Sequence, residues 1–170
     1  MIKFLTLFVE KQNKLQQIFG QILAWGLLTL VFISALIVVL RYGFDVGSIA
    51  LQEVALYNHA VIFMLGFAYT LQQNEHVRVD IFYGQMSDRK KAMVDFFGML
   101  FFALPVIAFI AWASWDYISL SWRVYESSAE VGGLEYVYLL KTVILVMTGL
   151  LGLQVFSVMI QSALKIGGRV

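Results

Sequence analysis

Four long stretches without a charged residue constrain the fold of this chain more than any other feature. They cover residues 15–40, 54–74, 96–115 and 142–164, with lengths of 26, 21, 20 and 23 residues. A helix of about 20 residues crosses the ~30 Å hydrocarbon core of a bilayer, so each stretch is long enough to span it. None has the alternating polarity of a transmembrane β-strand. The sequence therefore predicts an all-α membrane protein with four transmembrane helices.

Composition supports this class and excludes several others. Hydrophobic residues make up 61% of the chain, charged residues 14%, and the mean hydropathy is +0.81. A soluble domain is about half apolar and a quarter charged. The single proline and the lack of cysteine exclude a disulfide scaffold, a thiolate metal site and a cysteine nucleophile. A net charge of +1 gives no support for a nucleic-acid partner.

We place the transmembrane helices at about residues 15–40, 52–74, 88–117 and 135–164, in a single membrane domain covering residues 1–170. Ser48 and Ser87 stand where they could cap the second and third helices. Pro105 lies in the middle of the third helix and is expected to bend it. Glycines 132 and 133 indicate a turn before the fourth helix. The sequence shows no internal repeat, which argues against an inverted-repeat transporter formed by this chain alone.

The first 14 residues form a polar-apolar arm before the first helix. Its hydrophobic side chains fall on one helical stripe, and its lysines lie off that stripe. This pattern is typical of an amphipathic helix in the membrane interface, with its lysines attracted to anionic membrane lipids. A frayed tail is the alternative. The stretch at residues 15–40 is too long for a cleaved signal peptide and lacks a small-residue cleavage site.

Cations are distributed unevenly between the two sides of the predicted bundle. The side with the termini and the middle connection carries nine: Lys3, Lys11, Lys14, Arg78, Arg89, Lys90, Lys91, Lys165 and Arg169. The opposite side carries three: Arg41, Arg123 and Lys141. Because cytoplasmic segments carry the excess of Lys and Arg, we expect a multi-pass protein of the bacterial inner membrane with both termini in the cytoplasm.

Three charged residues lie at similar depth near the outer ends of the helices. Arg41 ends the first predicted helix, Glu53 begins the second, and Lys141 begins the fourth. Burial of one charge alone is expensive, so we expect Arg41 and Glu53 to pair with each other or with Lys141. The functional alternative is a contact with an ion or a substrate.

His59 lies about two turns into the second predicted helix. On a helical wheel it shares a face with Ala55 and Gly66, and small residues allow another helix to approach closely. We therefore expect a buried hydrogen bond from His59 to a neighbouring helix, with a proton relay as the alternative. A shared haem is excluded by geometry, because His59 and His76 are 17 residues apart, about 25 Å along a helix.

The middle connection contains His76, Arg78 and Asp80 in alternation with two valines. In an extended segment the three polar side chains lie on one side. We interpret this segment as a docked strand or an interfacial contact, and a solvated loop is the alternative.

The polar residues form no catalytic constellation. The sequence offers no nucleophile–base pair, no metal-ligand spacing and no phosphate loop. We therefore expect no enzyme activity and no cofactor in this chain. The residues alone indicate a membrane subunit that works by holding another protein.

The spacing of the polar residues resembles a family of transporter subunits. It is similar to the small membrane subunit, of the DctQ type, of tripartite ATP-independent periplasmic (TRAP) transporters. The resemblance extends over nearly the whole chain and rests on Arg41, Glu53-x3-Tyr57, Leu65-Gly66, His76-Val77-Arg78-Val79-Asp80, Asp95, Trp122-x3-Glu126-Ser127 and Gln154. The His-x-Arg-x-Asp element is its most specific part.

The resemblance implies a role in a three-part secondary transporter for an organic acid. A periplasmic substrate-binding protein delivers the solute, and a large membrane subunit with the substrate and sodium sites moves it by an elevator motion. The small subunit forms a heterodimer with the large one, scaffolds it and helps to dock the periplasmic protein. Together with the positions chosen above, this gives ten expected structural or interface residues: Arg41, Glu53, Tyr57, His59, Gly66, His76, Arg78, Asp80, Glu126 and Lys141.

Two other functions compete with this one. The first is a membrane anchor for a redox complex, which the histidine geometry argues against. The second is a small homo-oligomeric channel or exporter. That alternative predicts solute flux in liposomes that contain this chain alone, whereas a transporter subunit gives none without its large partner.

Overall fold

The computed structural model describes residues 2–75 and 83–168, and every regular element within them is helical. The elements are α1 (Ile2–Gly43), α2 (Ile49–Gln72), α4 (Asp88–Gly98), the π-helical turn η1 (Met99–Ala103), α5 (Leu104–Val124) and α6 (Val137–Ile166). Because α4, η1 and α5 follow one another without a break, Asp88–Val124 forms one rod. In the described ranges four helices are long and apolar enough to cross a membrane. The predicted all-α membrane fold is confirmed.

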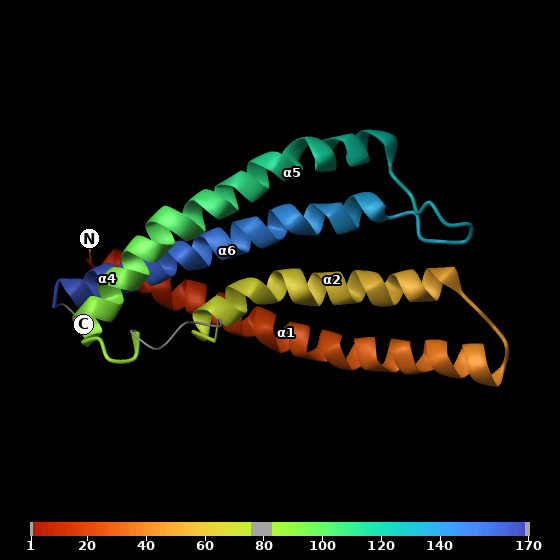
Figure 1. The fold of residues 1–170 in the computed structure, drawn as a ribbon, viewed down its shortest axis with the longest axis horizontal. Coiled ribbons are helices and arrows are strands. Elements are labelled where there is room, and N and C mark those ends of the chain that lie inside the picture. Colours follow the sequence, from red (N-terminus) through yellow and green to blue (C-terminus); the bar gives the residue numbers. More distant parts are fainter. Residues whose placement is uncertain (1, 76–82, 169–170) are drawn as a thin grey trace.

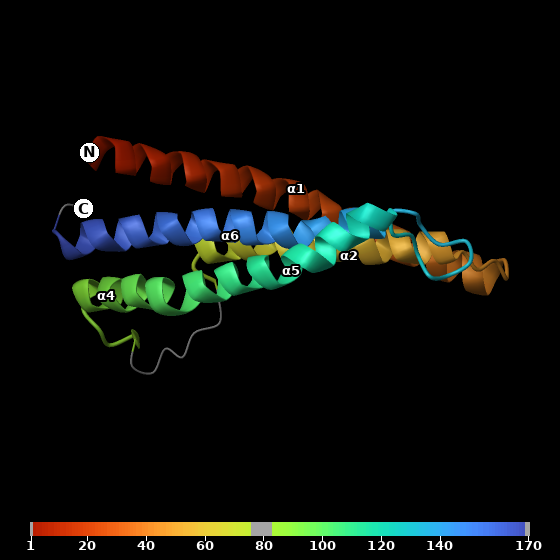
Figure 2. The ribbon, with the colours of Figure 1, turned by 90° about the horizontal axis from the view of Figure 1, so that it is seen from above.

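The helices form two hairpins with the same orientation (Figure 1). Short connections join α1 to α2 and α5 to α6 at one end of the bundle, which we call the hairpin end. Both chain termini and α4 lie at the opposite end, which we call the terminal end. Helix α6 is central, since it packs against α1, α2, α4 and α5. Seen from above, the N-terminal half of α1 diverges from α2 and runs beside α6 (Figure 2).

Helix α1 is longer than its predicted span. The arm at residues 1–14 is helical where the structure describes it, but it continues into the first span without a break. At 1.5 Å per residue the helix is about 63 Å long, twice the thickness of the hydrocarbon core. Gln12 and Gln16, on the inner face of this segment, are buried in the bundle. The arm therefore also packs against protein, and its contact with lipid stays a prediction.

Close backbone approach fixes α1 against α2. A Cβ atom on Gly20 would lie 2.5 Å from the ring of Tyr69. Six residues further along α1, the Gly26 carbonyl accepts a hydrogen bond from the Asn58 side chain of α2, with an N···O distance of 3.0 Å. A small apolar core of Leu71, Ile107 and Val155 then joins α2, α5 and α6.

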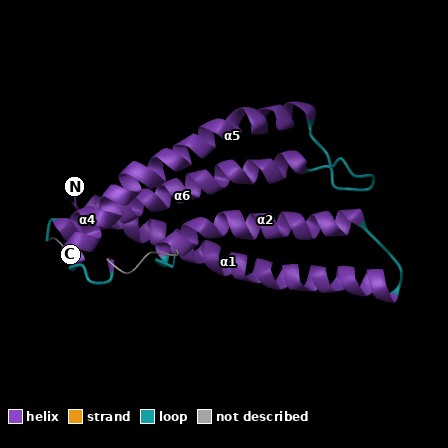
Figure 3. Cartoon of the chain, viewed as in Figure 1, coloured by secondary structure: helices purple, strands orange, loops and turns teal. Residues whose placement is uncertain are grey.

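The helix ends show which local predictions hold. The Ser48 hydroxyl caps α2 by accepting a bond from the Leu51 amide at 3.3 Å, as predicted. Ser87 occupies the N-cap position of α4 but makes no side-chain capping bond. The turn η1 directly precedes Pro105, where the missing proline amide interrupts regular α-helical bonding. Helix α5 extends to Val124, beyond the predicted end at residue 117. The figures show its rod as a continuous, bowed helix (Figure 3).

Candidate functional site

The hairpin end contains a polar cluster in which Glu53 is central. Glu53 lies in the second turn of α2, near the end where the helix begins. Its carboxylate accepts hydrogen bonds from the Ser128 hydroxyl and from the Leu134 backbone amide, the latter at 2.6 Å. Both donors belong to the loop between α5 and α6. One side chain of the first hairpin therefore holds the connecting loop of the second hairpin.

A second contact of the cluster joins Glu126 to Lys141. Glu126 directly follows the end of α5, and Lys141 lies in the first turns of α6, where its ammonium group forms an ion pair with the Glu126 carboxylate. The ammonium also lies 3.9 Å from the centre of the Tyr117 ring, at cation–π distance. The bond from Lys141, together with the nearby Ser121 hydroxyl, lowers the pKa of Glu126 below its ordinary value. This carboxylate therefore stays ionised at neutral pH.

Aromatic side chains hold α5 and α6 together beside this ion pair. The Trp122 indole donates a hydrogen bond to the Thr142 hydroxyl at 2.8 Å, and its ring packs edge-on against Tyr138. Tyr125 also meets Tyr138 edge-on and ends α5 with a left-handed backbone conformation, at φ 47°. These aromatic side chains therefore form a set of contacts between two helices.

Tyr57 lies one turn from Glu53 on α2, with its hydroxyl buried between the two parts of the cluster. Four of the ten predicted residues thus come together at the hairpin end. They are Glu53, Tyr57, Glu126 and Lys141.

The loop between α5 and α6 fits the carboxylate closely because of Gly133. A Cβ atom on Gly133 would lie 2.9 Å from a carboxylate oxygen of Glu53 and closer still to Ser128. Its neighbour Gly132 has a φ of 82°, which favours glycine. The predicted turn at these glycines is present, but its contact with Glu53 was not predicted. The paired glycines were the only signal of it in the sequence.

The predicted pairing of Arg41 is wrong. The Glu53 carboxylate is bonded to the loop and Lys141 is paired with Glu126, so Glu53 pairs with neither Arg41 nor Lys141. Arg41 is exposed at the end of α1, and in the described part of the chain it has no ion-pair partner. The depth of a residue in the membrane, inferred from its position in the sequence, does not specify which of several charged side chains face one another.

Within the described part of this chain, His59 and Gly66 do not make the helix contacts predicted for them. His59 is exposed and stacks on Phe63, with ring centres 6.2 Å apart, while its neighbour Asn58 makes the hydrogen bond to α1. Gly66 brings no helix close, since an added Cβ would meet nothing within 4 Å. A rotation of one residue along the helix separates the inward Asn58 from the outward His59.

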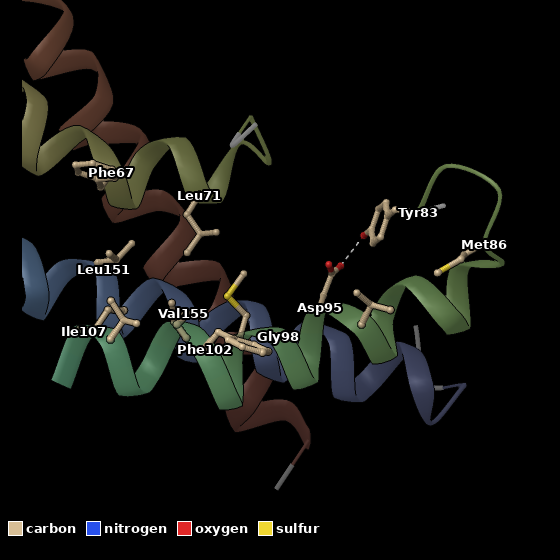
Figure 4. Close-up of a pocket in the computed structure, with 14 residues that line it drawn as sticks. Phe67, Leu71, Tyr83, Met86, Asp95, Gly98, Phe102, Ile107, Leu151 and Val155 are labelled. Carbon is tan, nitrogen blue, oxygen red and sulfur yellow. Dashed lines mark hydrogen bonds between the residues drawn. The ribbon is translucent and has the colours of Figure 1, made fainter. Parts of the chain in front are cut away.

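His76, Arg78 and Asp80 lie outside the described residues, so the interpretation of their segment stays a prediction. Directly after this segment the Tyr83 hydroxyl donates a hydrogen bond of 2.8 Å to Asp95 of α4 (Figure 4). These two residues border an apolar cavity of about 760 Å³ that is lined by α2, α4, η1, α5 and α6 and is shown in the same figure. A smaller polar cavity of about 460 Å³ adjoins it at the terminal end.

The polar cluster at the hairpin end holds elements of the chain together. The Glu53 carboxylate is held by donors of the loop between α5 and α6, and the Glu126 carboxylate is held by Lys141 of α6. These contacts fix the positions of the elements at the hairpin end. Among the described residues no three His, Cys, Asp or Glu side chains are grouped as a metal site would require. The fold and this site define a polytopic helical membrane protein whose polar residues brace its own helices.

A comparison of the sequence with known families gives the more specific assignment. Residues 30–165 match the model of the family described as tripartite ATP-independent periplasmic transporters, DctQ component. The match covers most of the chain, which therefore belongs to the DctQ family, the small membrane component of TRAP transporters. No curated protein and no solved structure matches the chain significantly.

Proposed function

We propose that this chain is a non-catalytic scaffold in a TRAP transporter that imports an organic acid. It forms a heterodimer with a large, sodium-coupled membrane subunit and holds the fixed part of that subunit while its mobile part moves solute. Membership of the DctQ family supports a tripartite assembly with partner subunits. The structural observation that carries the scaffold role is the bonding of Glu53 to the loop of the other hairpin.

That contact matters because a support for a moving partner must itself resist deformation. Helix α6 of the second hairpin packs against both helices of the first hairpin. At the hairpin end the Glu53 bonds also join α2 to the loop that precedes α6. Charged hydrogen bonds between elements distant in the sequence oppose their separation. The four long hydrophobic stretches contain no Asp, Glu, Lys or Arg. The sequence therefore gives no support for a hydrophilic route that would carry an anion through this chain.

The hairpin end is also the surface that we propose for docking the periplasmic substrate-binding protein. With the cation-rich terminal end in the cytoplasm of a bacterial cell, the hairpin end faces the periplasm. Arg41, Asp45 and Glu130 are exposed there and offer charges of both signs to a soluble partner. Steering by such charges makes association sensitive to salt.

Reconstitution tests the scaffold role. Proteoliposomes with this chain and its large subunit should take up solute in the presence of the binding protein and a sodium gradient. Proteoliposomes with this chain alone should show no uptake, and those with the large subunit alone should show little. Flux from this chain alone would instead indicate the homo-oligomeric channel, and a coloured, redox-active preparation would indicate the anchor of a redox complex.

A further inference from the structure

Helix α2 exposes a polar side chain at a depth where lipid cannot satisfy it. His59 lies ten residues after the first residue of α2, about 15 Å along a helix of about 36 Å, so it is close to mid-span. Its side chain is exposed, and in the described part of the chain its recorded contact is the ring stack with Phe63. An imidazole exposed to hydrocarbon is costly, and such residues face protein or water in membrane proteins.

Two other polar side chains of the same helix are satisfied within the chain. Asn58 donates to the carbonyl of Gly26, and Thr70 donates to the carbonyl of Gly66 at 3.0 Å. His59 therefore differs from them in needing a partner that this chain does not supply. The outward face of α5 exposes large hydrophobic side chains at similar depth: Val106, Phe109 and Trp112.

A groove begins at Phe63, the residue on which His59 stacks. It has a volume of about 530 Å³ and lies between α1 and α2, with Leu27, Phe63 and Gly66 among its walls. The space above Gly66 is open, since an added Cβ would meet nothing within 4 Å. Phe63 is 62% exposed at the edge of this groove. Small residues beside large ones let a second helix approach closely, and this packing drives association in membranes where the hydrophobic effect does not.

We propose that the His59 face, defined as His59, Phe63, Gly66 and the adjoining groove on α1, binds a membrane-spanning helix of the large transporter subunit. That helix presents a hydroxyl, amide or carboxylate group to the imidazole and packs against the backbone at Gly66. The inference rests on the proposed function for the existence of the large partner. This face combines a mid-span imidazole with an open groove beside a small residue.

Photo-cross-linking in the assembled complex tests the assignment. The photo-reactive analogue benzoylphenylalanine replaces Phe63, or as a matched control Trp112, in the full chain co-expressed with the large subunit. Both native side chains are aromatic and exposed, at 62% and 76%. We expect a cross-link to the large subunit from position 63 and none from position 112.

Each other outcome has a separate meaning. A cross-link from position 63 to a second copy of this chain, or equal cross-linking from position 112, would overturn the assignment. So would a cross-link to lipid alone when the large subunit still co-purifies, and the proposed function would then remain. If the large subunit does not co-purify with the unmodified chain, the proposed function itself fails and this inference fails with it.

Two substitutions measure the contributions of the polar group and the groove. His59→Leu replaces the imidazole with an apolar side chain of similar size. It should lower recovery of the large subunit about threefold, which corresponds to the loss of one average interhelical hydrogen bond. Gly66→Leu fills the groove and should abolish recovery. Gly149→Leu is the control, since Gly149 of α6 is exposed and equally free of neighbours. Unchanged recovery with both His59→Leu and Gly66→Leu would overturn the proposal.

Discussion

The two ends of the bundle hold their helices together in different ways. At the hairpin end the contacts between elements use full charges, with Glu53 bonded to a loop and Glu126 paired with Lys141. At the terminal end the bonds between the transmembrane helices come from neutral amides, as in the bond of 3.4 Å from Gln154 to Asn13. The Tyr83 hydroxyl bonds the Asp95 carboxylate there, and two cavities lie between the helices. Charge-assisted bonds are shorter and stronger than neutral ones. The hairpin end is therefore the braced end, and the terminal end is the looser one.

The largest expected effect comes from removing the carboxylate that braces the hairpin end. Glu53→Ala leaves the Ser128 hydroxyl and the Leu134 amide without their acceptor, and unsatisfied donors are costly. We expect the melting temperature in mild detergent, followed by circular dichroism, to fall by several degrees. Glu135→Ala removes an exposed acid from the same loop and should leave it unchanged. An equal effect of the two substitutions would contradict the bracing role of Glu53.

A smaller loss is expected when the loop is pushed away from the carboxylate. Gly133→Ala places a Cβ atom against Ser128 and Glu53, and such overpacking costs about 2 kcal/mol. The control is Gly47→Ala in the other connection of the hairpin end, where an added Cβ meets nothing within 4 Å. Denaturation of both variants in detergent gives the difference. A tolerated Gly133→Ala would show that the loop is not held closely.

The opposite sign is expected at the terminal end. Gln16 is fully buried, and neither its amide nitrogen nor its amide oxygen has a hydrogen-bond partner among the described residues. Gln16→Leu should therefore stabilise the chain by about 1 kcal/mol, measured by the same denaturation. Gln17→Leu, an exposed neighbour on the same helix, is the control. A destabilised Gln16→Leu variant would show that this amide does brace the terminal end.

The smallest expected effect is the pH dependence of the Glu126 pair. Because the folded state lowers the pKa of Glu126, its stabilising contribution is present above the ordinary carboxyl pKa of about 4.3 and is lost as the pH falls through the lowered value. The melting temperature of the native chain should thus fall more steeply on acidification than that of Glu126→Gln. Parallel curves for the two proteins would contradict this contribution.

The sequence predicted the helices better than it predicted their contacts. Uncharged runs located all four spans, and Ser48 was correctly expected to cap α2. The end of α5 lies at Val124 and not at the predicted residue 117, because a helix continues readily into the polar region outside the hydrocarbon. The pattern of hydrophobic residues along the chain reflects the local geometry of a helix, which depends mainly on interactions between neighbouring residues.

Half of the hairpin-end site was within reach of the sequence. Glu53, Tyr57, Glu126 and Lys141 were all chosen from the residues and the family resemblance, and the structure brings them together. Their partners were not predictable, because the Leu134 donor is a backbone amide that any residue carries. Arg41 was paired wrongly for a related reason: similar depth in the membrane does not specify the direction in which a side chain points.

The sequence by itself determined that this chain is a four-span helical membrane protein of the DctQ family, because hydrophobic length and motif spacing are properties of the linear chain. Only the tertiary structure decided which residues brace the bundle and which face outward. Asn58 and His59 are adjacent in the sequence, yet the packing of α1 against α2 turns the first inward and leaves the second exposed. A difference of one residue rotates a side chain by about 100° around a helix, and only the neighbouring helix defines which direction is the interior.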